Sequence, residues 1–261
     1  MSQTPTAGST ALLPEGLQSA IGRPFKHVVV FSGAGISADS GIPTFRGSQN
    51  GLWSRFDPEH LATPGAFRQN KALVWAWYEW RRGLVTRSQP NAGHLAAAEL
   101  QRKFGARVIT QNVDDLHERG GASDVLHLHG SLFAPRCFAC ARPFEDLPKP
   151  AVEPQLELIP PRCEHCGGYI RPGVTWFGEQ LDNDVVRAAT EAIRQCNLLL
   201  VVGTSGVVYP AAGLVEMAPR SALVIEINPI PSETPGRIDY RIPATAALGL
   251  PAIASSIGRQ A

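Results

Sequence analysis

Short apolar runs, rich in valine, isoleucine and leucine, alternate along the chain with longer stretches of helical composition. The runs predict buried strands of a parallel sheet at 27–31, 107–110, 125–128, 198–202 and 222–227. The longer stretches predict helices at about 64–86, 91–100, 185–195 and 211–217. Because strand and helix alternate on both sides of residues 136–168, a mostly parallel sheet with right-handed crossovers is the economical topology.

The composition narrows the class of protein further. The chain has 261 residues, of which 44% are hydrophobic and 18% are charged, so it has enough apolar side chains to bury a core and is not intrinsically disordered. Its net charge of +1 argues against a sequence-independent grip on nucleic acid. The longest apolar runs, such as 198–202, are far shorter than the roughly 20 residues that span a bilayer.

Four of the five cysteines form two pairs with the same internal spacing, inside a proline-rich segment that shows little apolar periodicity. The pairs are Cys137 with Cys140 and Cys163 with Cys166, and 22 residues separate them. Two such CxxC pairs supply the four thiolates of a tetrahedral zinc site that is closed to water and therefore structural. No export signal is visible at the amino end, so we expect a cytoplasmic protein with reduced thiols and one zinc ion.

A glycine-rich turn follows the first predicted strand. Residues 33–38 read GAGISA and match the dinucleotide-binding pattern G-x-G-x-x-G/A, in which backbone N–H groups reach a pyrophosphate at a helix N-terminus. A dehydrogenase would place an acidic residue at the end of a second strand about 20 residues later, but residues 44–58 read as a polar loop. The turn therefore indicates a dinucleotide without supporting hydride transfer.

Further motifs follow one another between about residues 20 and 255. They are residues 33–37 (GAGIS), 41–47 (GIPTFRG), 110–114 (TQNVD), 127–130 (HLHG), the two CxxC pairs, 176–179 (WFGE) and 202–210 (VGTSGVVYP). With these motifs in this order the chain resembles the sirtuins, a family of NAD-dependent protein lysine deacylases. It is most similar to the class III members of that family, because Tyr78 and Arg81 fit their Y-x-x-R signature.

The resemblance implies an α/β fold in which a Rossmann-like parallel-sheet domain carries an inserted small zinc-binding module and a helical module for cofactor and substrate loops. We expect a flexible lead at 1–20, a Rossmann-like NAD-binding domain at 21–47, 88–134 and 174–255, the helical part of a small domain at 48–87, and a structural zinc module at 135–173.

The chemistry that the resemblance implies begins when the acyl-lysine carbonyl oxygen attacks C1′ of the nicotinamide ribose and nicotinamide leaves. A general base then activates a ribose hydroxyl to carry the acyl group onward. His129 matches this base, and imidazole titrates near neutral pH. Asn112 and Asp114 match residues against the nicotinamide and its ribose, where an amide and a carboxylate act by positioning. His27, His60, His94, His117 and His165 are expected to be structural or on the surface.

The resemblance also implies the residues that contact NAD. They are expected to be Gly33, Ala34, Gly35, Ser37, Ala38, Asp39, Thr44, Phe45, Arg46, Trp53, Gln111, Asn112, Asp114, His129, Gly203, Thr204, Ser205, Asn228 and Ala244. Within this set Arg46 is expected to reach a phosphate and Phe45 to cover the reacting ribose.

The acyl-lysine substrate is expected to contact a second set of residues, namely Tyr78, Arg81, Val174, Trp176 and Phe177. Tyr78 and Arg81 are three residues apart on a predicted helix and so share one face. In class III sirtuins such a pair recognises an acidic acyl group, because a buried carboxylate requires charge-assisted hydrogen bonds. The peptide backbone is expected to add as a strand beside residues 173–177.

Two alternative functions remain open. One is an NAD-dependent protein ADP-ribosyltransferase or NAD glycohydrolase, which shares the early chemistry. The other is a zinc-ribbon nucleic-acid module with a degenerate cofactor site, which the near-zero net charge opposes. The favoured interpretation is a monomeric deacylase that removes succinyl, malonyl and also acetyl groups from lysine and releases nicotinamide and O-acyl-ADP-ribose. We expect its partners to be acylated proteins or peptides, with no nucleic acid and no membrane.

Overall fold

A six-stranded parallel sheet forms the centre of the larger part of the molecule. The computed structural model describes residues 12–44, 56–150 and 153–258. The sheet has the order β3-β2-β1-β6-β7-β8, and its strands are β1 (Val28–Ser32), β2 (Arg107–Thr110), β3 (Leu126–His127), β6 (Leu198–Val202), β7 (Leu223–Ile227) and β8 (Tyr240–Ile242). Every pairing in it is parallel, which confirms the predicted topology. The strand order reverses between β1 and β6, so a ligand crevice is expected at their carboxyl ends.

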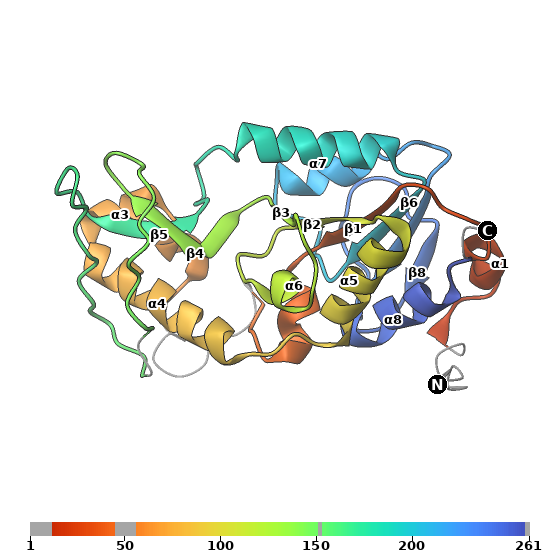
Figure 1. The fold of residues 1–261 in the computed structure, drawn as a ribbon, viewed down its shortest axis with the longest axis horizontal. Helices are drawn as coiled ribbons and strands as arrows, with labels where there is room; N and C mark the ends of the chain where they lie inside the picture. The colour runs from red at the N-terminus through yellow and green to blue at the C-terminus, as the bar shows by residue number, and fades with distance from the viewer. Residues whose placement is uncertain (1–11, 45–55, 151–152, 259–261) are drawn as a thin grey trace.

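Helices cover both faces of this sheet, because alternate residues of its inner strands are apolar on both sides. Val28 and Val30 pack into a cluster with the helices α1 (Leu17–Ile21), α5 (Ala92–Phe104) and α8 (Ala246–Ser256). Val29 and Phe31 pack on the opposite face with α7 (Asn183–Gln195) and the 3-10 helix η4 (Ala211–Met217). Figure 1 shows α7 along one side of the sheet and α5 and α8 along the other.

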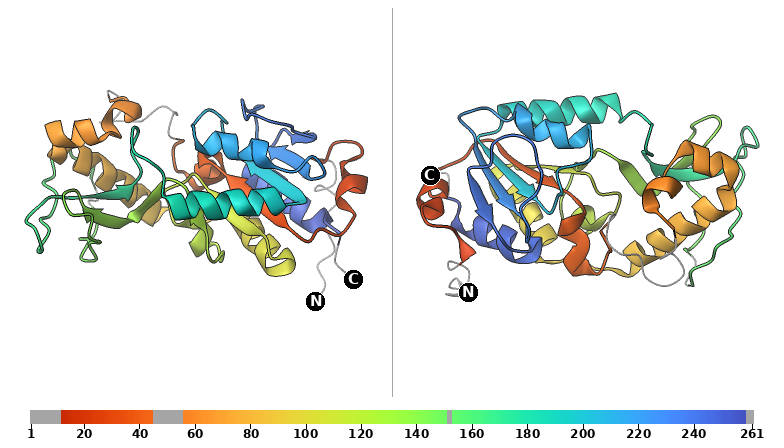
Figure 2. Two further views of the ribbon diagram at one scale, coloured as in Figure 1. Left: turned by 90° about the horizontal axis from the view of Figure 1, so that it is seen from above. Right: turned by 180° about the vertical axis from the view of Figure 1, so that it is seen from behind.

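A smaller unit lies at the other end of the elongated molecule (Figures 1 and 2). It contains the antiparallel pair β4 (Gly130–Cys137) and β5 (Ile170–Val174) together with α2 (Pro58–Leu61), α3 (Pro64–Gln69) and α4 (Lys71–Arg87). Phe67, Trp77 and Trp176 are fully buried and are the largest side chains of its apolar cluster. The sheet of this unit begins at Gly130, before the expected module boundary at residue 135.

The helix predicted over 64–86 is two helices. Asn70 lies between α3 and α4 with φ −144° and ψ 81°, and its side-chain oxygen accepts a hydrogen bond from Leu73 N at 3.0 Å. An asparagine in this arrangement caps a new helix, so the chain changes direction there. The 211–217 segment is a 3-10 helix and not an α-helix, and only Leu126–His127 of the predicted strand 125–128 pairs with β2. None of the helices in the described ranges is long and apolar enough to cross a membrane.

Both ends of the described chain contain elements that the sequence did not predict. Leu17 and Ile21, on α1, are fully buried against the sheet, although residues 1–20 were expected to be a flexible lead, and residues 1–11 lie outside the described ranges. At the carboxyl end β8 and α8 complete the sheet and its cover. Gly249 allows α8 to approach β7 closely, because a Cβ there would lie 2.5 Å from a methyl group of Ile227.

We predict that replacing Leu17 with alanine lowers the free energy of unfolding by about 2–5 kcal/mol, because it opens a cavity between α1 and the sheet. Urea denaturation of the purified protein measures this loss. The neighbouring variant Gln18→Ala changes an exposed side chain of the same helix and should stay within about 0.5 kcal/mol of the parent. Equal stabilities of the two variants would contradict the docking of α1.

Candidate active site

A cavity of about 420 Å³ opens at the carboxyl edge of the sheet and extends to the small unit. Five strands direct the residues that follow them toward it. Gly33 follows β1, Gln111 follows β2, His129 comes two residues after β3, Gly203 follows β6 and Asn228 follows β7, and all five line the cavity. The arrangement is the one expected of an open parallel sheet, which binds ligands where its strand order reverses.

The glycine turn contacts the β6 side of this cavity backbone to backbone. Gly33 N donates to Val202 O at 3.0 Å, and Gly35 N donates to Gly203 O at 2.7 Å. A Cβ on Gly35 would lie 2.7 Å from the Cα of Gly203, and Gly203 itself has φ +58°. These two glycine N–H groups are therefore used to hold the turn against β6, and the glycines serve close packing more than direct donation to a pyrophosphate.

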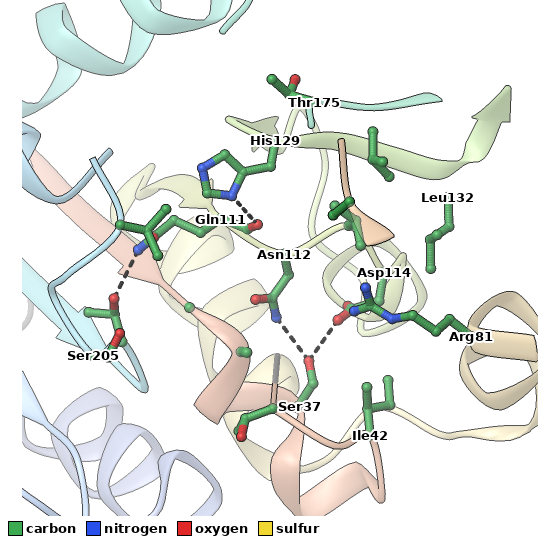
Figure 3. A pocket seen from close by; sticks show the side chains of 18 of the residues that line it. Ser37, Ile42, Arg81, Gln111, Asn112, Asp114, His129, Leu132, Thr175 and Ser205 are labelled. Carbon is green, nitrogen blue, oxygen red and sulfur yellow. Dashed lines mark hydrogen bonds between the residues drawn. The ribbon is translucent and has the colours of Figure 1, made fainter. Parts of the chain in front are cut away.

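A hydrogen-bonded group of buried polar side chains follows the turn, and Figure 3 shows Asn112 and Asp114 both pointing toward Ser37. Ser37 Oγ donates to Asp114 Oδ2 at 2.9 Å and accepts from Asn112 Nδ2 at 3.0 Å. Asn112 and Asp114 are each only 6% exposed and both line the cavity. Burial raises the pKa of Asp114, while hydrogen bonds from Leu116 N and Ser37 lower it, and the net shift is upward.

His94 contacts this group through Ser37, and the sequence gave no reason to place it at the site. Asn91 N donates to its Nδ1 at 3.2 Å, so Nε2 carries the ring proton and faces Ser37 Oγ at 3.4 Å. Burial lowers the pKa of His94 to about 4, and the ring is neutral at physiological pH. The capping-box position of His94, three residues after Asn91, is the only signal in the sequence that could have pointed to it.

His129 presents the features of a general base. Its Nδ1 lies 2.9 Å from Gln111 O, and because a carbonyl can only accept, Nδ1 carries the proton. The unprotonated nitrogen is then Nε2, on the other side of a ring that lines the cavity. Burial lowers the pKa of His129, and the bond to the carbonyl opposes this effect only in part, so the ring is neutral and able to accept a proton at physiological pH.

The loop after β6 is held from two sides. Gln111 Nε2 donates to Thr204 Oγ1 at 3.0 Å, and Asn228 Nδ2 donates to Thr204 O at 2.9 Å. Behind it, Glu233 N donates to Ser205 O at 2.9 Å. The predicted cofactor residues Gly203, Thr204, Ser205 and Asn228 therefore lie in one rigid corner of the cavity.

A buried carboxylate that the sequence did not single out organises the segment behind that corner. Glu226, on β7, is 2% exposed, accepts from Ser232 N at 3.1 Å and pairs with Arg241. Ser232 in turn bonds Thr234, which lies directly against Gly206. A glutamate inside an apolar strand requires such partners, and this requirement is the signal by which Glu226 could have been found.

The far end of the cavity is bounded by α4. Tyr78 is 3% exposed, and its hydroxyl accepts a hydrogen bond from Trp176 Nε1 at 3.0 Å. Burial raises the pKa of Tyr78 to about 12, against a smaller opposing effect of Arg81. Burial also lowers the pKa of Arg81, and Tyr78 and Asp114 oppose that shift. Leu84 and Val85 line the same wall and were missed, although they lie one helical turn beyond Arg81.

The segment after β5 is fixed by a buried arginine. Arg171 forms a two-pronged ion pair with Glu179 and donates to Val174 O at 2.7 Å, and its guanidinium lies 3.4 Å from the centre of the Trp176 ring. Thr175 N donates to His129 O at 2.8 Å. These contacts hold Val174 and Trp176, which line the cavity together with Phe177, and their role in binding the substrate stays a prediction.

Some predicted cofactor residues are not brought to the cavity. Ala38 and Asp39 are exposed on the far end of the 3-10 helix η2 (Ala34–Ser40), and Ala244 is buried in the core between β8 and α8. None of these three lines the cavity, whereas Ala34 and Thr44 do. Phe45, Arg46 and Trp53 lie outside the described residues, and their roles remain predictions.

The four paired cysteines converge at the distal end of the small unit. All four Sγ atoms lie within 4.8 Å of one another; Cys137 and Cys166 are 3.4 Å apart and Cys140 and Cys163 are 3.8 Å apart. A tetrahedron with zinc–sulfur bonds of about 2.3 Å requires sulfur separations of about 3.8 Å, so the residues fit a closed, structural zinc site. His165 is exposed and not part of the cluster, and Cys196 is buried in the core of the larger unit.

Comparisons with known proteins agree with this geometry. A sequence profile described as "Sir2 family" matches residues 33–210. The chain is 54% identical over 213 residues to NAD-dependent protein deacylase 1 of Pseudomonas aeruginosa, covering 80% of this chain and 85% of the relative. It is 49% identical over 228 residues to NAD-dependent protein deacylase of Mycobacterium tuberculosis H37Rv, covering 87% of this chain and 96% of the relative.

Solved structures are similar over almost the whole chain. A crystal structure of a Sir2 homologue–NAD complex has a TM-score of 0.83 and 41% identity and covers 94% of this chain and 93% of its own. A second structure, titled Sir2-p53 peptide-NAD+, has a TM-score of 0.77 and 25% identity, with coverage of 93% and 98%.

We predict that the purified protein contains about one zinc ion per chain and that Cys166→Ser loses it. Cys166 is exposed, so this change removes a ligand without opening a cavity in a core. Metal analysis by atomic emission, together with the thermal unfolding temperature, measures the effect. Cys196→Ala is the matched control and should retain the metal, and full zinc content in Cys166→Ser would rule the site out.

Proposed function

The chain belongs to the Sir2 family, and from that premise we propose that it acts on lysines that carry acidic acyl groups, succinyl and malonyl, and also on acetyl-lysine. Membership makes it an NAD-dependent protein deacylase, an enzyme with protein substrates. The observation that supports the acidic preference is the placement of Tyr78 and Arg81 together on the wall of the cavity that the glycine turn also lines.

The proposed NAD site is the part of the cavity at the sheet edge. The turn from Gly33 to Gly35, the corner around Thr204 and Asn228, and the Asn112–Asp114 segment would hold NAD there. When bound, NAD supplies an activated bond at C1′ of the nicotinamide ribose, at which the acyl oxygen is captured. Gly35 packs so closely on Gly203 that any side chain would separate them, and this packing holds the turn against β6 at the edge where the ligand would lie.

His129 is proposed to accept a proton from a ribose hydroxyl at its Nε2. The hydrogen bond from Nδ1 to Gln111 O supports this role in two ways, because it selects the tautomer with Nε2 free to accept and fixes the plane of the ring. Asn112 and Asp114 are proposed to orient the nicotinamide and its ribose. Their mutual partner Ser37 holds both side chains in place before the substrate arrives, which is positioning catalysis.

The acyl pocket is proposed to neutralise a carboxylate. Burying such a charge without partners is costly, and Arg81 supplies a permanent positive charge on an otherwise apolar wall formed by residues such as Leu84 and Leu132. Tyr78 keeps its proton at physiological pH, because its pKa is raised to about 12. Since Trp176 donates to the phenol oxygen, Tyr78 can direct its own proton toward a carboxylate in the cavity.

We further propose that the enzyme acts in the cytoplasm as a monomer and binds neither nucleic acid nor membrane. Four thiolates that hold a metal require a reducing compartment, and a net charge of +1 offers little attraction for phosphate polymers. The segment at Val174–Phe177 is proposed to bind the peptide backbone as an added strand, which would permit many substrate sequences.

Mass spectrometry of the products tests the reaction. From NAD, water and a succinyl-lysine peptide, the expected products are free lysine peptide, nicotinamide and O-succinyl-ADP-ribose. His129→Ala should lower turnover by about 100-fold or more, because a positioned general base contributes about that factor. ADP-ribosylated protein, or free ADP-ribose with the acyl peptide intact, would instead identify a transferase or a glycohydrolase.

Replacing Arg81 with alanine should separate the acyl substrates. We expect kcat/KM for succinyl- and malonyl-peptides to fall about 10- to 100-fold, the equivalent of one charge-assisted hydrogen bond, with a much smaller effect on the acetyl peptide. Arg87→Ala is the matched control, since Arg87 is exposed at the end of the same helix. Equal losses on all three peptides would contradict the proposal that Arg81 recognises acidic acyl groups.

A further inference from the structure

His127 lies at the end of β3 with both of its ring nitrogens facing oxygen acceptors. Nδ1 is 3.0 Å from Asn112 O, and Nε2 is 2.7 Å from Glu118 Oε1. A backbone carbonyl cannot donate, and an ionised carboxylate cannot donate either. When Glu118 is ionised, only the doubly protonated imidazolium can donate to both oxygens. A neutral ring has one unprotonated nitrogen, whose lone pair would face a lone pair of an oxygen.

His129 makes a matching contact with the preceding residue. The two imidazoles bind successive backbone carbonyls. His129 binds the carbonyl of Gln111, and His127 binds the carbonyl of Asn112. They differ in the second nitrogen, which lies in the cavity wall for His129 and is bound to Glu118 for His127. The contacts therefore favour a neutral ring for His129 and a cationic ring for His127.

The contact with His127 completes the fixing of Asn112. Thr110 Oγ1 accepts from Asn112 N at 3.1 Å, His127 holds Asn112 O, and Ser37 holds the side-chain amide. Without His127 the carbonyl of Asn112 loses its cationic partner, and Asn112 loses one of these three hydrogen bonds.

We propose that His127 is a positioning residue whose imidazolium cation holds Asn112 in its working position, and that loss of this charge at alkaline pH limits the activity of the enzyme. This inference rests on the roles proposed for Asn112 and His129. His127 does not touch the substrate and acts through Asn112.

The groups around His127 favour its charged form. Glu118 faces it from α6 (Leu116–Arg119), and Asp114 adds a second negative charge from the preceding loop. Burial opposes protonation of His127, but the hydrogen bonds to Glu118 and to the Asn112 carbonyl outweigh it, and the pKa of His127 is raised. Burial likewise opposes ionisation of Glu118, yet the bond and charge of His127 hold the pKa of Glu118 below its usual range.

The other titratable groups nearby do not reverse this balance. On α6, His117 is neutral because burial takes its pKa well below the usual value, and Arg119 donates to the carbonyls of Val85 and Ser88 beside Asp115. On α5, His94 is also neutral. The opposite face of β3 points toward α7, where Leu126, Val185 and Val186 all pack against one apolar cluster that contains no charged side chain.

The sign of the pH dependence follows from these shifts. The pKa of His127 is raised, so its contribution is complete below the ordinary value of about 6.5 and is lost as pH rises through the raised value. The pKa of His129 is lowered, so the base is ready once pH exceeds that lower value. Activity should therefore rise through the His129 pKa, form a plateau and fall again through the His127 pKa.

Steady-state kinetics of the full chain with NAD and an acyl peptide, from about pH 5 to pH 10, test this profile. The wild type should give a bell-shaped kcat/KM. His127→Gln should lower kcat/KM about 2- to 10-fold on the plateau, as expected for one lost hydrogen bond, and should lack the alkaline limb while keeping the acid limb. An alkaline limb in His127→Gln at the wild-type position would overturn the proposal.

Glu118→Gln provides a second variant that keeps the side-chain oxygen but removes the charge. It should move the alkaline limb to lower pH, because the neutral amide no longer favours the imidazolium. Glu99→Gln, which removes a half-buried carboxylate paired with Lys103 on α5, is the matched control and should leave the profile unchanged. A merely structural role for His127 would alter the stability of Glu118→Gln without moving the limb, and that result would count against the proposal.

NMR titration of the His127 ring in the free protein separates this inference from the proposed function. The ring should titrate above about pH 6.5 and should remain cationic at neutral pH even if no acyl peptide is turned over. A ring that is neutral at pH 7 would overturn the proposal whatever the activity, whereas a cationic ring in an enzyme inactive on every acyl peptide would challenge only the proposed function.

Discussion

The close approach of two backbones at the centre of the parallel sheet sets the geometry of the whole site. The turn after β1 touches the loop after β6 through Gly35 and Gly203, with no side chain between them. Because the strand order reverses at this point, the neighbouring loops diverge and leave a crevice that covering helices do not fill. The N–H groups of Gly33 and Gly35 donate hydrogen bonds to carbonyls at the end of β6, so the turn is anchored without a ligand.

The buried polar side chains that contact Ser37 follow from that anchoring. A group as buried as Asp114 or Asn112 is stable only when its hydrogen bonds are made, and Ser37, on the helix that begins in the turn, supplies one to each. The turn, the β2 loop and α5 therefore form one hydrogen-bonded unit, in which Asn91 sets the tautomer of His94 and His94 bonds Ser37. These hydrogen bonds fix the side chains proposed to orient the nicotinamide ribose within the fold itself.

Much of this arrangement was predictable from the sequence. The elements that were missed are those that no repeating sequence pattern marks. The inner strands were found because both faces are buried, which gives continuous apolar runs such as residues 198–202. The zinc site was found because CxxC spacing is itself a geometric constraint, and the family motifs identified His129 and Asn112. The helix α8 was missed because its apolar residues lack a polar face, and the break at Asn70 was missed because a single capping residue carries it.

Other residues of the site depend on contacts between distant segments that no local pattern records. Glu226 and Arg241 are 15 residues apart and meet across two adjacent strands, and His127 differs from His129 only in what its second nitrogen meets. Residue type and spacing are alike for the two histidines. The opposite charge states that their contacts favour come from the tertiary position of Glu118, which lies beside one ring and not the other.

The antiparallel pair β4–β5 explains how a zinc ion so far from the cavity can matter to it. At one end of the pair Cys137 lies opposite Ile170, and at the other end Gly130 lies opposite Val174. Gly130 directly follows His129, and Val174 begins the segment proposed to bind the peptide. A Cβ on Gly130 would lie 2.2 Å from Gly173 O, so the two strands close tightly at the cavity end. Tying the distal end with four thiolates removes the freedom of the strands to slip, and their register determines where the substrate segment lies relative to the base.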